Sequence, residues 1–238
     1  AYAIYSRTNT TISDCQLQVQ TMGANDAFGF VAEKGTNLLS NCSATVYSYT
    51  TGAYGVNQMG GTTTIEGGNY SIIAAQSSTP TAQNSSLYGI KNNSRSTTIL
   101  NNVTFSIQAP NNTFSQYAYG IYAEGIVNST ACTYTTDVRT QAYGVYGKGA
   151  SSNLSLIGNT ITTTAGNGAN SYGVYAEKKF YIDGDIVTAN ATTTAAYALN
   201  FTSGAVGKVR EGKFCGRSIG TGTSNFGAIN SAASAANV

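Results

Sequence analysis

The chain has 238 residues, a formal net charge of +2 and 41% hydrophobic residues, but only 9% of its residues are charged. The hydrophobic share suffices for a packed core. Because typical domains carry about 25% charged residues, uncharged Thr, Ser, Asn and Gly must form most of this surface. Lys and Arg are scattered singly, which argues against a nucleic-acid partner, and no apolar run reaches the roughly 18 residues of a membrane span. Histidine and the CxxC motif are absent, so the sequence offers neither a cysteine-based zinc site nor an imidazole base for nucleophilic catalysis.

A short phrase built around an aromatic residue recurs along the whole chain, for example AYGV at residues 53–56 and AYGI at residues 118–121. Its copies follow one another at a mean spacing of about 28 residues, and self-similarity at roughly 20 to 50 residues indicates a solenoid, a propeller or an array. The aromatic residues of the successive copies are Tyr2, Phe28, Tyr54, Tyr88, Tyr119, Tyr143, Tyr172, Tyr197 and Phe226.

A second phrase follows the first: an apolar residue, two turn-forming residues and an apolar alternation. Examples in chain order are ISDCQLQV (12–19), LSNCSATV (39–46), LNNVTFSI (100–107), LIGNTITT (156–163) and YIDGDIVT (181–188). The pattern predicts strand, tight bend and strand, so each unit holds three short strands, and no helical periodicity is present. Three strands bury their inner faces if each unit coils once and stacks about 4.8 Å from the next. A four-stranded propeller blade needs about 40 residues, more than the repeat of about 28 residues supplies.

With LIGNTITT and YIDGDIVT as generic turn-bearing repeats, the chain resembles the right-handed parallel β-helix superfamily of pectate-lyase-like enzymes, phage tailspikes and autotransporter passengers. The resemblance is architectural and carries over no catalytic residue. We therefore expect an all-β fold, a right-handed parallel β-helix (β-solenoid) of about eight to nine coils with three short strands each. Residues 1–238 form one domain, or a segment of a longer solenoid. Corner loops are expected at 76–86, 109–116 and 163–171, either as a binding edge or as tolerated insertions.

Stacking turns each repeat position into a column of equivalent residues. By period-2 alternation, the aromatic residue and the residue two positions later, such as Tyr119 and Ile121, are predicted to face the core. Small neighbours such as Gly120 would then leave the outer face flat. An outer aromatic column would lie beside them, either stacked within the solenoid or available as a platform for sugar rings or another copy. This outer column contains Tyr5, Tyr122, Tyr146 and Tyr175.

A third column carries charges that alternate in sign between neighbouring coils. Arg7 would lie next to Glu33, and Lys148 would lie between Glu124 and Glu177. Opposite charges on adjacent strands stabilise a sheet, so these pairs support the register. Carboxylates that are held in such pairs are poor candidates for catalysis.

The four cysteines leave the redox state open. Cys15 and Cys42 fall at the same repeat position in consecutive coils, at a separation that a disulfide tolerates. A bridge and a pair of stacked free thiols both fit the sequence, because Cys is often a small buried residue. Cys132 and Cys215 have no partner in an adjacent coil.

Two further groups of side chains are candidates for binding. Asp183, Asp185 and Glu211 come from neighbouring turns and would make a small cation site, unless they form only a solvated turn. Rows of Thr residues, Thr133 with Thr135 and Thr162 with Thr164, would present hydroxyls on a solenoid face. The next coil places Val187 and Ala189 at those positions, so the rows are too few for an ice-binding array.

Asn-x-Ser/Thr sequons are more frequent than the composition predicts by chance. They indicate either a glycosylated secreted protein or Asn at turns beside Thr-rich strands. The sequons begin at Asn9, Asn41, Asn69, Asn84, Asn92, Asn102, Asn111, Asn128, Asn153, Asn190 and Asn200.

The ends of the repeat array favour a structural role. The chain begins inside a repeat without a signal peptide, and its last residues carry no obvious polar cap, although a free solenoid needs caps. We therefore expect an extracellular or surface-exposed structural or adhesive solenoid, a filament subunit or stalk whose partners are copies of itself or cell-surface glycans. The alternative is a carbohydrate-binding or polysaccharide-cleaving β-helix that uses the corner loops. No cofactor is expected.

Overall fold

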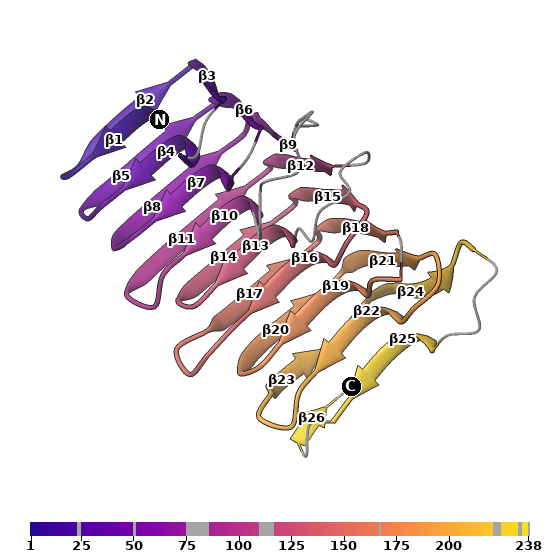
Figure 1. Cartoon of the computed structure of the whole chain (residues 1–238). Coiled ribbons are helices and arrows are strands. Elements are labelled where there is room, and N and C mark those ends of the chain that lie inside the picture. Colours follow the sequence, from indigo (N-terminus) through magenta and orange to yellow (C-terminus); the bar gives the residue numbers. More distant parts are fainter. Residues whose placement is uncertain are drawn as a thin grey trace.

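The computed structural model describes residues 1–22, 25–49, 51–74, 86–109, 117–166, 168–220 and 225–232, and the backbone of 235–237. Within these ranges every regular element is a β-strand, and all strand pairs are parallel. The strands form three long sheets that run side by side along the molecule, with the N-terminus at one end of the stack and the C-terminus at the other (Figure 1). Two of these sheets, here named A and B, have nine strands each, and the third, sheet C, has eight. Three stacked parallel sheets confirm the predicted parallel β-helix.

The three sheets take their strands in turn, one from each sheet per coil. Sheet A contains β1 (Tyr2–Ser6), β4 (Ala27–Ala32), β7 (Ala53–Gln58), β10 (Leu87–Asn92), β13 (Ala118–Ala123), β16 (Ala142–Gly147), β19 (Ser171–Ala176), β22 (Ala196–Phe201) and β25 (Phe226–Ser231). Sheet B contains β2 (Thr10–Ser13), β5 (Thr36–Ser40), β8 (Gly61–Glu66), β11 (Ser96–Asn101), β14 (Ile126–Thr130), β17 (Asn153–Ile157), β20 (Lys179–Asp183), β23 (Val206–Val209) and β26 (Ala235–Asn237). Sheet C contains β3 (Gln16–Thr21), β6 (Ser43–Ser48), β9 (Asn69–Ala74), β12 (Thr104–Ala109), β15 (Thr133–Val138), β18 (Thr160–Ala165), β21 (Asp185–Ala191) and β24 (Gly212–Ser218).

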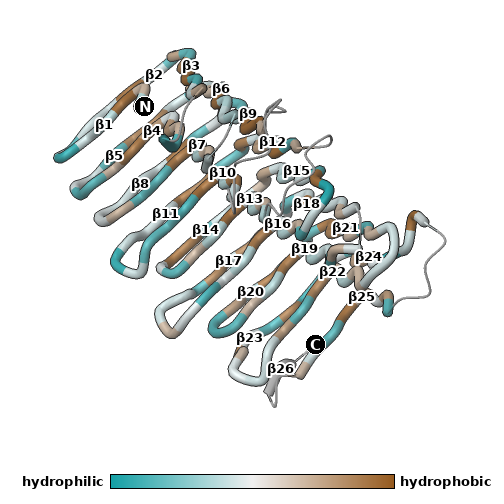
Figure 2. Tube along the Cα trace, viewed as in Figure 1, coloured by the Kyte–Doolittle hydropathy of each residue, from teal (hydrophilic) through white to brown (hydrophobic). Residues whose placement is uncertain are grey.

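The core is a column of apolar side chains that the three sheets enclose. In sheet C the alternation is regular: Tyr70 and Ile72 of β9 are buried, whereas Asn69 and Ser71 face outward. Inward rings stack from coil to coil, with centroids 4.9 Å apart between Tyr70 and Phe105. Figure 2 shows the same repetition: hydrophobic segments recur at matching positions along successive strands. Burial of this continuous column is what stabilises units that could not fold alone.

Sheet A departs from period-2 alternation, and the predicted inward position of its aromatic column is wrong. In β7, Tyr54 is half-buried on the outside, whereas Gly55 and Val56 are both buried. A Cβ on Gly55 would lie 2.7 Å from the carbonyl oxygen of Gly89 and 3.1 Å from Cδ1 of Ile72, a core residue of sheet C. The glycine therefore faces the interior. Because two consecutive residues of the strand, Gly55 and Val56, both point inward, the aromatic residue before them and the residue three positions after that aromatic residue lie on the same outer face.

The last coil also differs from the sequence alignment. Phe226 pairs with Ala196 in the register of β22 and β25, and Gly227 occupies the place opposite Tyr197. The aromatic column therefore ends at Tyr197, and Phe226 lies outside it, with 37% of its surface exposed. The sequence alignment placed Phe226 opposite Tyr197, one position after its observed partner Ala196.

Most of the short turns that connect sheet B to sheet C contain one residue with positive φ, and the turn before β9 contains two, Gly67 and Gly68. Asp14, Asn41 and Asn102 have φ between 51° and 55°, and Gly158 has φ of 64°. Asn, Asp and Gly tolerate this left-handed conformation better than other residues, which explains the turn residues in the second phrase. Ala131 takes the same conformation with φ of 54°, although its sequence carries no turn signal.

The expected corner loops lie mostly outside the described residues. Of 76–86 only Ser86 is described, and of 109–116 only Ala109, which ends β12. The third loop is shorter than expected, because residues 163–165 belong to β18 and Ser171 begins β19. No described segment forms a helix that would have the length and apolar character of a membrane span.

Candidate functional site

The outer face of sheet A carries a ladder of stacked aromatic rings. Ring centroids lie 4.6 Å apart between Phe28 and Tyr54 and 5.0 Å apart between Tyr119 and Tyr143, and the rings are nearly parallel. The column of Tyr122, Tyr146 and Tyr175 packs beside it on the same face. Tyr119 and Tyr143 are each only 8% exposed, so the rings cover one another rather than forming an open platform. Burial raises the pKa of both phenols above its ordinary value.

Charged side chains lie along this aromatic face, but only part of the expected charge column pairs. Arg7 Nε lies 3.4 Å from Glu33 Oε2. Lys148 makes no ion pair with Glu124 or Glu177 in the described part of the chain, and its Nζ lies 5.6 Å from the ring centroid of Tyr122.

The two glutamates accept hydrogen bonds from tyrosines of the column beside the ladder. Glu177 accepts one from the Tyr146 hydroxyl at 2.6 Å, and Glu124 accepts one from Tyr122 at 3.1 Å. Hydrogen bonds to phenols, rather than ion pairs with Lys148, therefore hold these carboxylates.

The acidic turn does not form the expected cation site. Asp185 is fully buried, and its Oδ1 accepts hydrogen bonds from the backbone and side-chain amides of Asn159 at 2.7 and 2.8 Å. Asp183 accepts hydrogen bonds through Oδ2 from Tyr181 at 2.8 Å and from Arg210 at 3.1 Å. Glu211 only lines a shallow hollow near Asp185. Asp185 faces the interior and Asp183 pairs outward, so the carboxylates of this turn do not converge. Among the described residues no three His, Cys, Asp or Glu side chains are grouped as metal ligands.

A buried polar network, which sequence reasoning missed, engages Asp185. Asn159 Oδ1 accepts hydrogen bonds from the Ser129 hydroxyl at 2.7 Å and from the Cys132 amide at 3.0 Å. Ser129 also bonds the hydroxyl of Tyr134 at 2.7 Å. Desolvation raises the pKa of Asp185, although its hydrogen bonds oppose this shift. The signal available in the sequence was the turn glycine before two of these residues, Gly158 before Asn159 and Gly184 before Asp185; Ala131 gives no such signal before Cys132.

All four cysteines are free thiols. Cys15 and Cys42 lie on neighbouring rungs, because Gln16 pairs with Ser43, but no disulfide joins them. Their sulfurs instead donate to local carbonyl oxygens, Cys15 to Ser13 at 3.2 Å and Cys42 to Ser40 at 3.4 Å. Of the two arrangements that the sequence allowed, the structure has the stacked free thiols.

The outer face of sheet C is a nearly uncharged array of hydroxyl and amide groups. Its register corrects the expected Thr rows: Thr133 pairs with Thr160, and Thr135 pairs with Thr162, which pairs with Thr188. The central column is continuous over the whole sheet and contains Gln18, Thr45, Ser71, Ser106, Thr135, Thr162, Thr188 and Cys215. The expected alignment of Thr133 with Thr162 is wrong by two residues, because Ala131 takes the turn position of its coil without a turn-forming side chain. The expected alignment of Thr162 with Val187 is wrong by one residue.

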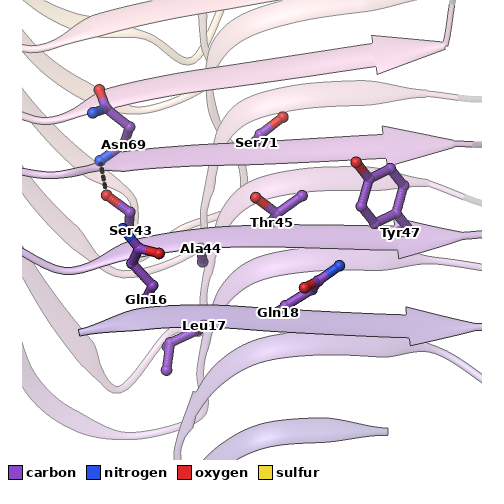
Figure 3. Close-up of a pocket in the computed structure, with 9 residues that line it drawn as sticks. All are labelled: Gln16, Leu17, Gln18, Ser43, Ala44, Thr45, Tyr47, Asn69 and Ser71. Atoms are coloured by element: carbon purple, nitrogen blue, oxygen red, sulfur yellow. Dashed lines mark hydrogen bonds between the residues drawn. The ribbon is translucent and has the colours of Figure 1, made fainter.

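The first three strands of this face surround a hollow of about 540 Å³. Figure 3 shows its side chains in three columns, with Gln16, Ser43 and Asn69 in the first, Gln18, Thr45 and Ser71 in the second, and Tyr47 in the third. The Ser43 hydroxyl accepts a hydrogen bond from the Asn69 backbone amide at 3.2 Å. None of the lining residues is charged.

The structure separates the sequons into three groups by the exposure of the asparagine. Asn92 is fully buried, with its side chain bonded to Thr98 and to the Gly125 amide, and Asn190 and Asn200 are 6% and 7% exposed. Asn84 and Asn111 lie outside the described residues. The exposed sequons are Asn9, Asn41, Asn69, Asn102, Asn128 and Asn153.

The chain matches no known protein-family model, and neither the curated proteins nor the solved structures contain a significant match to it.

Proposed function

We propose that this chain is a structural or adhesive solenoid module that works outside the cell as a filament subunit or a segment of a surface stalk. The open ends of the described stack support this role. β1 pairs only with β4 among the described strands, and β25 pairs only with β22, so each leaves one strand edge without a neighbour. Such edges are templates for pairing with another strand.

The side chains at these ends fit an added coil. Ile4, Ile12 and Leu17 belong to the core column but are only partly buried in the first coil. Phe214 and Ile229 are the corresponding half-covered residues at the other end. An added coil with the same inward pattern would bury both sets, and each Å² of apolar surface removed from water contributes roughly 25 cal/mol. A further coil of this chain or a second copy would serve equally.

The surface composition supports an extracellular location. Uncharged hydroxyl and amide side chains dominate the outer face of sheet C, and exposed sequons outside its hollow begin at Asn9, Asn41, Asn102, Asn128 and Asn153. We therefore propose that the module acts through its regular faces, and we propose no catalytic role.

Electron microscopy of the purified 238-residue chain tests end-to-end stacking. We expect rods and filaments longer than the roughly 40 Å that nine rungs about 4.8 Å apart would span. Substituting Ile4→Lys together with Ile229→Lys places charges in both end faces and should leave short isolated rods. Ile186→Lys, on an exposed lateral position, is the matched control and should leave filaments intact. Isolated short rods for the unsubstituted chain would contradict the proposal.

A further inference from the structure

We propose that the hollow over β3, β6 and β9 on the outer face of sheet C binds a neutral oligosaccharide. The proposal does not depend on end-to-end stacking, because the hollow lies on the side of the solenoid (Figure 3). Its volume of about 540 Å³ lies within the range of small-molecule sites.

The polar groups of the hollow are available to a ligand. In the part of the chain that the structure describes, the side-chain amides of Gln16, Gln18 and Asn69 form no hydrogen bond, and neither do the hydroxyls of Thr45 and Ser71. These groups both donate and accept, which suits sugar hydroxyls that also do both. They project from strands whose backbones are fixed by parallel pairing, so the array is preorganised.

Tyr47 supplies the apolar surface that a sugar ring needs. It lies in the third column, paired with Gln20 on β3 and Ile73 on β9, and its ring borders the hollow in Figure 3. An aromatic ring with a polar hydroxyl offers a flat apolar face next to hydrogen-bonding groups. The C–H face of a pyranose can pack on this ring while its hydroxyls meet the amides of the neighbouring columns.

The charge distribution selects a neutral ligand. No lining residue is charged, so the hollow has no group to balance a uronate, sulfate or phosphate. Charged side chains on this face come from more distant strands, with Asp137 on β15 and Lys213 and Arg217 on β24. Burying the charge of an anionic polysaccharide in the hollow would therefore cost free energy that no lining group compensates.

The face continues beyond the hollow in a way that suits a chain of sugar units. Ser106 and Thr135 extend the central column next to the hollow, one residue per strand at about 4.8 Å. An oligosaccharide lying along the solenoid axis would meet a further hydroxyl at each strand. Affinity should accordingly increase with the number of sugar units.

Other occupants suit this face less well. A protein partner would be expected to bury aromatic and Arg anchors, and the hollow contains only Tyr47 of these types. An ice lattice would need a flat plane, whereas the hollow and the bulky Tyr47 beside the central column make this end of the face uneven.

Isothermal titration of the 238-residue chain with defined oligosaccharides tests the site. The neutral probes are cello-, manno-, xylo- and chito-oligosaccharides from disaccharides to hexasaccharides, and oligogalacturonate is the anionic control. We expect at least one neutral series to bind, with affinity rising with length, and oligogalacturonate not to bind. Tyr47→Ala and Thr45→Val should each weaken binding of the trisaccharide about tenfold, a loss typical of one anchoring contact.

Thr188→Val is the matched control, because it makes the same change in the same column on β21, far from the hollow. It should leave trisaccharide binding unchanged, and thermal unfolding should show that all three variants are folded. Three results would overturn the proposal: no binding of any neutral series, equal effects of Thr45→Val and Thr188→Val, or equal binding of oligogalacturonate. Thermal hysteresis in freezing solutions, lost in both Thr variants, would assign the face to ice instead. Self-association that only Thr45→Val abolishes would assign it to a second copy.

Discussion

Replacing Gly55 by alanine distinguishes an inward glycine column from an outward one. If the glycine faced solvent, the added methyl group would be nearly neutral. In the structure the new Cβ lies 2.7 Å from the Gly89 carbonyl oxygen and 3.1 Å from Ile72 Cδ1, both closer than ordinary contacts. The backbone of β10 or the core side chain must move, and such overpacking typically costs about 1–3 kcal/mol.

Urea and thermal unfolding, followed by circular dichroism, measure this cost. A loss of about 2 kcal/mol lowers the Tm of a chain of this size by roughly 4–8 °C. Gly227→Ala is the matched control in the same sheet, because its Cβ would lie 3.4 Å from the Tyr197 ring, an ordinary contact, and should change Tm little. Equal stability of Gly55→Ala and the unsubstituted chain would refute the inward glycine column.

Three further predictions concern the aromatic ladder, the buried carboxylate and the thiols. Tyr143→Ala should lower the free energy of unfolding in urea by about 3 kcal/mol, because this ring is 8% exposed between two stacked neighbours. Tyr2→Ala should cost far less, because Tyr2 is 57% exposed. Equal losses for the two variants would contradict the ladder. Burial raises the pKa of Asp185 above its ordinary 3.8, so the native state binds this proton more tightly and stability falls as pH rises through the raised pKa. Asp185→Asn should remove that fall, and a Tm difference that does not vary with pH would contradict it. A thiol reagent should label exposed Cys215 before buried Cys42 and Cys132 in the native state and label all four thiols after unfolding without reductant.

The coil could be predicted from the repeat length. Which side chains of sheet A point inward could not be predicted in the same way. A period near 28 residues with one tight bend leaves room for three strands, and parallel stacking follows because each unit must bury its inner face on the next. The period-2 rule assumes that every inward position carries a side chain. Gly55 has none, so Val56 can also point inward, and Tyr54 is displaced to the outside.

The candidate sites were predicted less well because their geometry depends on single residues. Asp183 ends β20 and Asp185 begins β21, and the turn at Gly184 between them sends Asp185 into the core beside Asn159 and leaves Asp183 with Arg210. No local pattern specifies that choice. The Thr columns were missed for a related reason: Ala131 adopts a left-handed turn conformation that Gly, Asn or Asp normally signals.

The outer faces of sheets A and C differ in how much of their composition folding explains. Ring stacking explains the aromatic face of sheet A, and high strand propensity explains Thr135, Thr162 and Thr188 on sheet C. Strand propensity does not explain Asn69, because Asn is depleted in strands, and its side chain bonds nothing in the described part of the chain. The hollow thus includes an outward polar side chain that strand propensity does not explain. Polar groups that line a hollow and have no role in strand formation fit recognition better than stability, whereas strand propensity accounts for the longer Thr rows.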